Sequence, residues 1–152
     1  SSKTSITSSL ESTSYTVFPF ANSLNITSDS FVFIDIYCSF FLITNEYLDL
    51  IYYTNDLVRI YPKCEQFALV KEIKVALYNG LRYMMYAIKS YNKQDKIKSL
   101  NELDIQLKLL KVHCRLSYKY KYISMQNYQT WSTHITDICN MLGGWITSCQ
   151  KR

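Results

Sequence analysis

Residues 128–145 of this 152-residue chain are YQTWSTHITDICNMLGGW, and they carry a regular apolar pattern. The large apolar side chains follow one another at alternating spacings of three and four residues: Tyr128, Trp131, Ile135, Ile138, Leu142 and Trp145. Such spacing puts them on one face of an α-helix and is typical of a helix in an antiparallel bundle. We therefore predict a C-terminal helix, which Ser124 can cap.

Three further helices are predicted upstream. The first begins at about Thr44 and Asn45, which are candidate caps, and it ends before Pro62, because the residue before a proline is pushed out of helical geometry. Gly and Pro number only 3 and 2, which disfavours a turn-rich β-sandwich. We expect an all-α fold, an antiparallel up-down-up-down four-helix bundle.

The second and third helices are separated by a polar stretch. The second is predicted over residues 64–91, where apolar positions step by three or four: Val70, Ile73, Leu77, Leu81, Met84, Ile88 and Tyr91. Residues 92–98 break this pattern, and Ser99 to Glu102 then have the form of a capping box that begins the third helix.

The N-terminal quarter of the chain has a different composition. Residues 1–30 contain ten Ser and five Thr, which indicates a flexible leader. The apolar residues 31–43 are consistent with a strand, a helix extension or an interaction segment. We expect a poorly ordered or extra segment over residues 1–43, the bundle over 44–148, and a basic tail over 149–152.

Charge is distributed unevenly along the chain, whose formal net charge is +5. Residues 1–58 contain one basic and six acidic residues, whereas residues 59–152 contain 16 basic and 6 acidic ones. A basic half of this kind usually indicates a polyanionic partner.

The five cysteines are odd in number and form no C-x-x-C pair, which disfavours a disulfide framework or a zinc finger and fits a reducing compartment. Residues 31–43 contain Asp35 and are shorter than the roughly 20 apolar residues that a membrane-spanning helix needs. The Ser/Thr-rich start also lacks the pattern of a signal peptide. We therefore expect a cytoplasmic protein with no membrane contact.

The predicted third helix has two apolar faces. Its inner face consists of Leu103, Leu107, Leu110 and Cys114, and its outer face consists of Ile105, Leu109, Val112 and Leu116. A four-helix core needs only one of these faces, so we expect the outer face to meet another subunit in a homo-oligomer.

Between the two faces lies a basic stripe, made of Lys108, Lys111, Arg115 and Lys119. It is about 16 Å long at 1.5 Å per residue, a length that spans several phosphates. One interpretation is a solvated face with salt-bridge partners. The other is a site for the RNA or DNA backbone, which flanking bases such as Lys121 would extend.

Candidates for catalysis are few. His113 and His134 are the only histidines, and neither has metal-ligand spacing; the carboxylates form no pair suited to acid and base catalysis, and no phosphate-binding glycine loop is present. We predict no catalytic residue, no metal and no cofactor. An enzyme that depends on the two histidines is the weakest of the functional hypotheses.

Gly143 and Gly144 lie within the apolar pattern of the last helix. Each glycine costs about 1 kcal/mol relative to alanine in a helix. Either a close approach of another backbone or a C-terminal cap with Trp145 folding back would explain them.

Three motifs resemble those of a known family. Residues 61–69, YPKCEQFAL, are similar to its F-P-K-S-E-[RK]-F-x-L junction between the first two helices, with Tyr61 for the usual Phe and Cys64 for the Ser. Residues 116–124 are similar to its turn between the third and fourth helices. Residues 138–145, ICNMLGGW, resemble its terminal E-I-G-R-M-L-G-G-W signature, with Cys139 and Asn140 in place of Gly-Arg.

The family is that of the Avd-like four-helix-bundle proteins, the accessory variability determinants of diversity-generating retroelements, which are related to 23S rRNA intervening-sequence proteins. The resemblance covers about residues 45–148. It implies a non-enzymatic homopentameric ring that works with the retroelement reverse transcriptase and binds template RNA or cDNA on a basic surface. The positions that match the motifs, mostly structural ones, are Pro62, Phe67, Leu69, Arg115, Gly143, Gly144 and Trp145. The alternative is an oligomeric scaffold of the intervening-sequence type that binds only protein.

Overall fold

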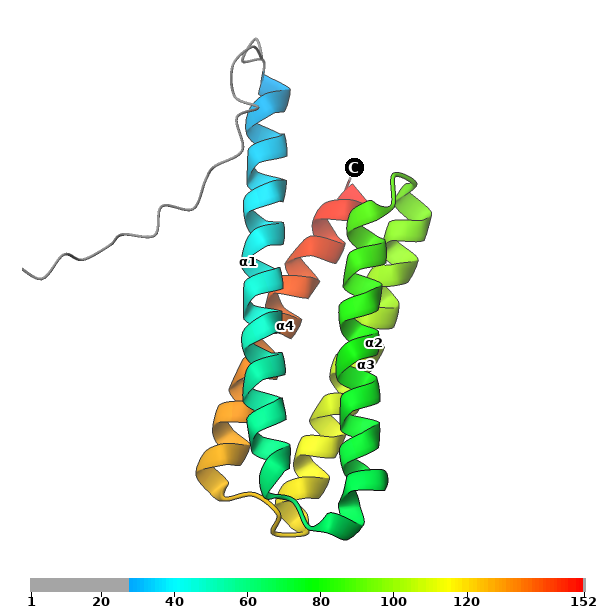
Figure 1. The fold of residues 1–152 in the computed structure, drawn as a ribbon. Coiled ribbons are helices and arrows are strands. Elements are labelled where there is room, and N and C mark those ends of the chain that lie inside the picture. The colour runs from blue at the N-terminus through cyan, green and yellow to red at the C-terminus, as the bar shows by residue number, and fades with distance from the viewer. Residues whose placement is uncertain (1–27, 152) are drawn as a thin grey trace, which may run out of the picture.

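The computed structural model describes residues 28–151, with side chains from Phe40 onward. Four long helices run alternately down and up (Figure 1). They are α1 (Ser28–Leu57), α2 (Leu69–Lys89), α3 (Lys93–Lys119) and α4 (Met125–Lys151), and the short 3-10 helices η1 (Val58–Ile60) and η2 (Lys63–Phe67) connect α1 to α2. This confirms the predicted all-α antiparallel four-helix bundle.

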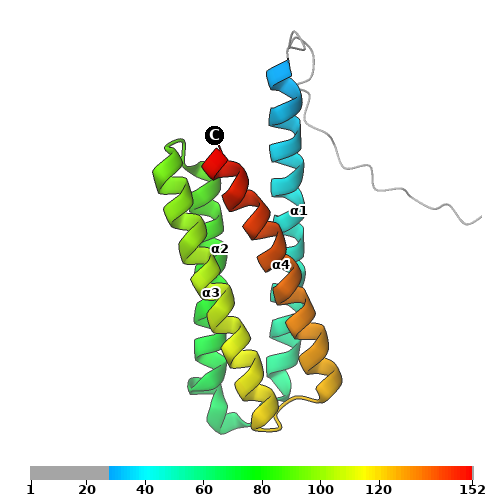
Figure 2. The same cartoon turned by 180° about the vertical axis from the view of Figure 1, so that it is seen from behind.

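The four helices do not pack equally against one another. α3 packs extensively on α2 and then on α4, and α4 also packs on α1. Of the four pairs of neighbouring helices, α1 and α2 touch each other least. The N-terminal part of α1 projects beyond the other helices, and the C-terminal end of α4 leans away from α1 towards α2 and α3 (Figures 1 and 2). The edge between α1 and α2 is therefore the most open edge of the bundle.

The core consists of the apolar positions that the helical spacing predicts. Trp131, Ile135, Ile138 and Leu142 of α4 are at most 1% exposed, and so are Val70, Ile73, Leu77 and Met84 of α2. Tyr91 is wrongly included in the α2 pattern, because α2 ends at Lys89 and the Tyr91 side chain is fully exposed.

The spacing of apolar residues does not predict the close contact between Tyr47 of α1 and Gly80 of α2. The buried Tyr47 hydroxyl donates a hydrogen bond to the carbonyl oxygen of Leu77 at 2.8 Å. A Cβ at Gly80 would overlap the Tyr47 hydroxyl oxygen and lie 3.3 Å from Leu103 Cδ1. Glycine at position 80 thus makes room for a side chain of α1 that is hydrogen-bonded to the backbone of α2.

The first helix begins earlier than predicted. α1 starts at Ser28, and Thr44 lies inside it, donating from Oγ1 to the carbonyl oxygen of Phe40 at 2.9 Å. The prediction of a cap at Thr44 and Asn45 is wrong because Ile43 and Tyr47, on one face one turn apart, are both buried, so the helix passes through the polar pair. Of the three alternatives for residues 31–43, the structure has the helix extension. The flexible leader was predicted over residues 1–30; residues 28–30 instead form the start of α1, and residues 1–27 lie outside the described residues.

The starts of the second and third helices also differ from the prediction. Residues 63–67 form η2 instead of the start of a helix. Glu65 in this turn accepts hydrogen bonds from the Leu69 amide at 3.4 Å and from the Tyr122 hydroxyl at 2.9 Å. The second bond joins the α1–α2 connection to the turn between α3 and α4. α3 begins at Lys93, where the Asn92 side chain accepts from the Gln94 amide at 3.0 Å. The predicted capping box at Ser99 is wrong, because an earlier cap was available.

The predicted cap of the last helix is confirmed. Ser124 Oγ accepts a hydrogen bond from the Asn127 amide at 3.1 Å, immediately before α4. The preceding turn places Lys121 at φ 61°, in the left-handed region that non-glycine residues rarely adopt. This tight turn holds the start of α4 against the end of α3.

Candidate nucleic-acid interface

The two faces of α3 differ in burial. On the inner face, Leu103, Leu107 and Leu110 are fully buried. On the outer face, Ile105, Leu109 and Val112 are 48%, 42% and 53% exposed, and Leu116 is partly buried. The outer face therefore has no partner within the described part of the bundle, as the two-faced pattern of the helix predicts.

The basic stripe lies on the surface beside the outer face. Lys108, Arg115 and Lys119 are exposed, and Lys111 is partly buried. Lys108 Nζ lies 2.6 Å from Asp104 Oδ2, and this carboxylate raises the pKa of Lys108. Among the described residues, the other three cations of the stripe have no carboxylate within ion-pair distance. The salt-bridged interpretation thus holds for one end of the stripe only.

The first half of the stripe, Lys108 and Lys111, lies towards α4. Burial raises the pKa of the Cys139 thiol on α4, and the positive charge of Lys111 opposes that rise, so these two side chains are electrostatic neighbours. The stripe ends near the turn to α4, where Lys121 is exposed. Its strained backbone conformation fixes the direction of the chain at that point.

The predicted structural positions fall into two groups. Leu69 is partly buried at the first position of α2, and Trp145 is partly buried with its ring centroid 6.1 Å from that of Phe40. By contrast, Pro62 is exposed and Phe67 is 88% exposed, so Phe67 adds nothing to the described core. Pro62 instead precedes η2 and accepts a backbone hydrogen bond from Glu65 at 3.0 Å.

Gly143 and Gly144 are exposed in the middle of α4. The helix continues to Lys151, so the prediction of a C-terminal cap is wrong. No described atom lies within 4 Å of a Cβ built at either glycine, so the close approach of another backbone does not occur within the described chain either.

The two histidines are separate from each other and from any cluster of metal ligands. Burial lowers the pKa of His113, which is electrostatically coupled to Glu72 on α2, whereas the His134 ring lies 5.5 Å from the Tyr53 ring on α1. Nowhere in the described residues do three His, Cys, Asp or Glu side chains come together as metal ligands. Burial raises the pKa of Cys114 to about 12, so this thiol is protonated near neutral pH and is a poor nucleophile.

The Asp104–Lys108 pair was missed in the sequence, although a carboxylate four residues before a lysine is a readable signal on a helix. The described helices also include none long and apolar enough to cross a membrane. The candidate interface on α3 thus consists of a row of cations beside an exposed apolar face.

Comparison with known proteins identifies the family of this bundle. The model of the bAvd-like family matches residues 41–149. The chain belongs to the bAvd-like family. The match covers the bundle except the N-terminal part of α1 and the last two residues of α4, and it includes the basic stripe, the outer face and both exposed glycines.

A solved structure has the same fold as this bAvd-like chain. It is the crystal structure of a protein of unknown function from the S23 ribosomal protein family of Bacteroides thetaiotaomicron. The TM-score is 0.65 at 16% sequence identity, and the alignment covers 72% of this chain and 98% of the other. No curated protein matched the chain significantly.

Proposed function

We propose that this bAvd-like chain is a non-enzymatic accessory protein of a diversity-generating retroelement. In this proposal it assembles into a homopentameric ring and binds the reverse transcriptase. The basic stripe on α3 holds the backbone of template RNA or cDNA, so that the protein supports mutagenic reverse transcription.

The observation that carries the nucleic-acid part is the charge of Lys111, Arg115 and Lys119 on one edge of α3, which no carboxylate of the described residues pairs. A cation without a carboxylate partner can neutralise a phosphate and release its counterion, whereas a paired one must first give up its partner. Neighbouring members of the three lie four residues apart, so the row offers successive contacts along one strand.

Support for assembly comes from the outer face. Exposed apolar side chains at Ile105, Leu109 and Val112 are next to the stripe on the same helix. If copies of the chain bury this face against one another, the stripes come together and their potentials add. Phosphate binding then strengthens with assembly.

A charge reversal with a matched control tests the stripe. We expect Lys111→Glu with Arg115→Glu to weaken binding of a labelled structured RNA at least tenfold in fluorescence anisotropy, with helical content unchanged by circular dichroism. The control, Lys71→Glu with Lys89→Glu, makes the same change in net charge on exposed positions of α2 and should cost at most about threefold. Equal losses in both variants, or none in the first, would contradict the proposal.

A second measurement tests assembly. By sedimentation velocity at micromolar concentration, the wild-type chain should be an oligomer, and Leu109→Asp should convert it to a monomer that stays helical. Met85→Asp, at a residue of α2 that is 44% exposed, is the matched control and should leave the oligomer intact. A monomeric wild type would refute the ring.

The reverse transcriptase is tested separately, by its retention on the immobilised chain. The gene's neighbourhood should also contain a reverse transcriptase and paired template and variable repeats. A chain that forms an oligomer and binds protein but no nucleic acid would instead be a scaffold of the 23S rRNA intervening-sequence type.

A further inference from the structure

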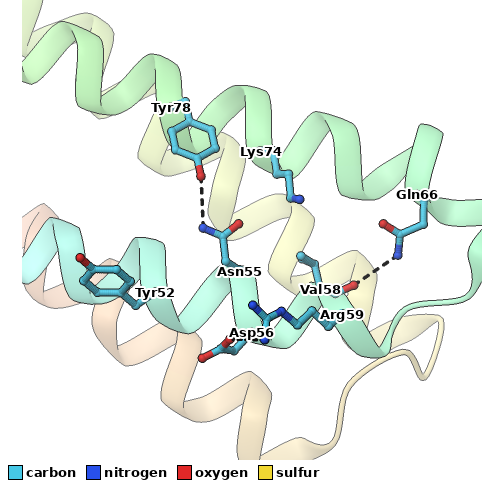
Figure 3. A pocket seen from close by; sticks show the side chains of 8 residues that line it. All are labelled: Tyr52, Asn55, Asp56, Val58, Arg59, Gln66, Lys74 and Tyr78. Atoms are coloured by element: carbon cyan, nitrogen blue, oxygen red, sulfur yellow. Dashed lines mark hydrogen bonds and ion pairs between the residues drawn. The ribbon is translucent and has the colours of Figure 1, made fainter.

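A pocket of about 420 Å³ lies between α1 and α2, at the edge where these helices touch least (Figure 3). Its volume is within the range of about 300–1,000 Å³ that small-molecule sites occupy. The pocket is on the opposite edge of the bundle from the basic stripe, because α3 and α4 form the other pair of neighbours. Neither the family match nor the stripe accounts for it.

The pocket lining contains two cations, Arg59 and Lys74, and one carboxylate, Asp56, and this excess of positive charge favours an anion. Lys74 extends from α2 towards α1, and it has no ion-pair partner among the described residues. Arg59 makes a single contact with Asp56, Nη1 to Oδ1 at 3.3 Å, and both side chains are more than 70% exposed. A pair as exposed as this is weak, so the guanidinium can turn towards a phosphate group at little cost.

The aromatic side chains favour a planar group beside that anion. Tyr52 on α1 is 66% exposed, and Tyr78 on α2 is 46% exposed, on two sides of the same pocket (Figure 3). The Tyr78 hydroxyl accepts a hydrogen bond from Asn55 Nδ2 at 3.2 Å, which fixes this ring. Tyr52 is the more exposed of the two side chains, so its ring face is available for stacking.

Two amides complete the lining. Gln66 Nε2 donates to the carbonyl oxygen of Val58 at 3.4 Å, and Asn55 is held by Tyr78. Each amide therefore has its nitrogen engaged, and neither carbonyl oxygen accepts a hydrogen bond from the described residues. These oxygens suit the amino or imino hydrogens on the edge of a nucleobase.

We propose that the pocket between α1 and α2 binds a nucleoside monophosphate unit, with its phosphate at Arg59 and Lys74 and its base stacked on Tyr52. The unit is either a free nucleotide or the phosphorylated end of a strand, since the two share this chemistry. The site is independent of the basic stripe and does not require the proposed role in reverse transcription.

Isothermal titration calorimetry of the full chain with AMP tests the site. We expect saturable binding, with adenosine and inorganic phosphate each at least tenfold weaker, because each lacks one of the two recognised groups. Lys74→Gln and Tyr52→Ala should each weaken AMP binding about three- to tenfold. Both side chains are exposed, so circular dichroism should show unchanged helical content.

Matched controls distinguish the pocket from general charge and aromatic effects. Lys71→Gln and Tyr86→Ala change exposed residues of α2 that do not line the pocket, and both variants should bind AMP as the wild type does. Lys111→Glu with Arg115→Glu should also retain AMP binding, so failure of the stripe and failure of the pocket are separable. Absence of AMP binding, or equal losses in the pocket variants and their controls, would overturn the proposal.

Competition identifies the source of the nucleotide. The competitors are an oligoadenylate with a 5′-phosphate and the same strand without it. If only the phosphorylated strand displaces AMP, the site binds the phosphorylated end of a strand. If neither strand displaces AMP, the ligand is a free nucleotide. Equal displacement by both strands would contradict a site that requires a terminal phosphate.

Discussion

The inner and outer faces of α3 have nearly the same chemical composition, but the inner face is packed in the core and the outer face is exposed. Leu107 on the inner face is fully buried, whereas Leu109, two residues later, is 42% exposed. The bundle needs only one apolar face of this helix, so the other is available for a role outside the fold. The comparison teaches that an apolar residue stabilises this bundle only where its side chain is buried. An apolar face that the core does not use is a candidate surface for assembly.

The largest expected effect is on the inner face. Leu107→Ala should lower the free energy of unfolding by about 2–5 kcal/mol, because it leaves a cavity in a fully packed core. The matched change, Leu109→Ala, should cost less than about 1 kcal/mol in a dilute monomeric sample. Urea denaturation measures both, and similar losses for the two variants would remove the distinction between the faces.

A smaller effect is expected where the inner face meets the contact between α1 and α2. Gly80→Ala places a methyl group against Tyr47 and Leu103, and it should cost about 1–3 kcal/mol of unfolding free energy. Tyr47→Phe removes the overlapping oxygen, so the double variant should be more stable than the sum of the two single effects predicts. Strict additivity in thermal or urea unfolding would show that the contact between Tyr47 and Gly80 is not close.

The smallest effect separates stability from binding at the end of the stripe. Lys121→Gly should raise the unfolding free energy by up to about 1 kcal/mol, because φ 61° suits glycine, while RNA affinity falls about two- to threefold. Lys121→Ala loses the same charge without relief of the backbone, and it should lower affinity equally with no gain in stability. If both variants keep full affinity, Lys121 does not contribute to the interface.

The sequence predicts the core of this bundle well and the ends of its helices less well. The periodic positions of α2 and α4 are buried as expected, since most of the stability of a helix in a protein comes from packing its apolar face. Local capping signals at Thr44 and Ser99 were misleading, because buried neighbours and an earlier cap at Asn92 outweigh a cap's contribution of about 1 kcal/mol.

The candidate sites also differ in how well the sequence predicts them. The outer face and the basic stripe lie on one helix, so spacing alone could locate them. The α1–α2 pocket could not be predicted, because Tyr52, Gln66 and Tyr78 come from three elements whose approach depends on the tertiary fold. The contact between Tyr47 and Gly80 was missed for the same reason.

The salt dependence of RNA binding tests most directly the claim that the stripe beside the outer face contacts phosphates. For the wild-type chain, the logarithm of the association constant should fall linearly with the logarithm of salt concentration. We expect a slope of about −2 or steeper on a single strand, from the three cations of the stripe that pair with no carboxylate of the described residues. The Lys111→Glu, Arg115→Glu variant should have a clearly shallower slope. A slope near zero for the wild type, or the same slope for both proteins, would contradict the account.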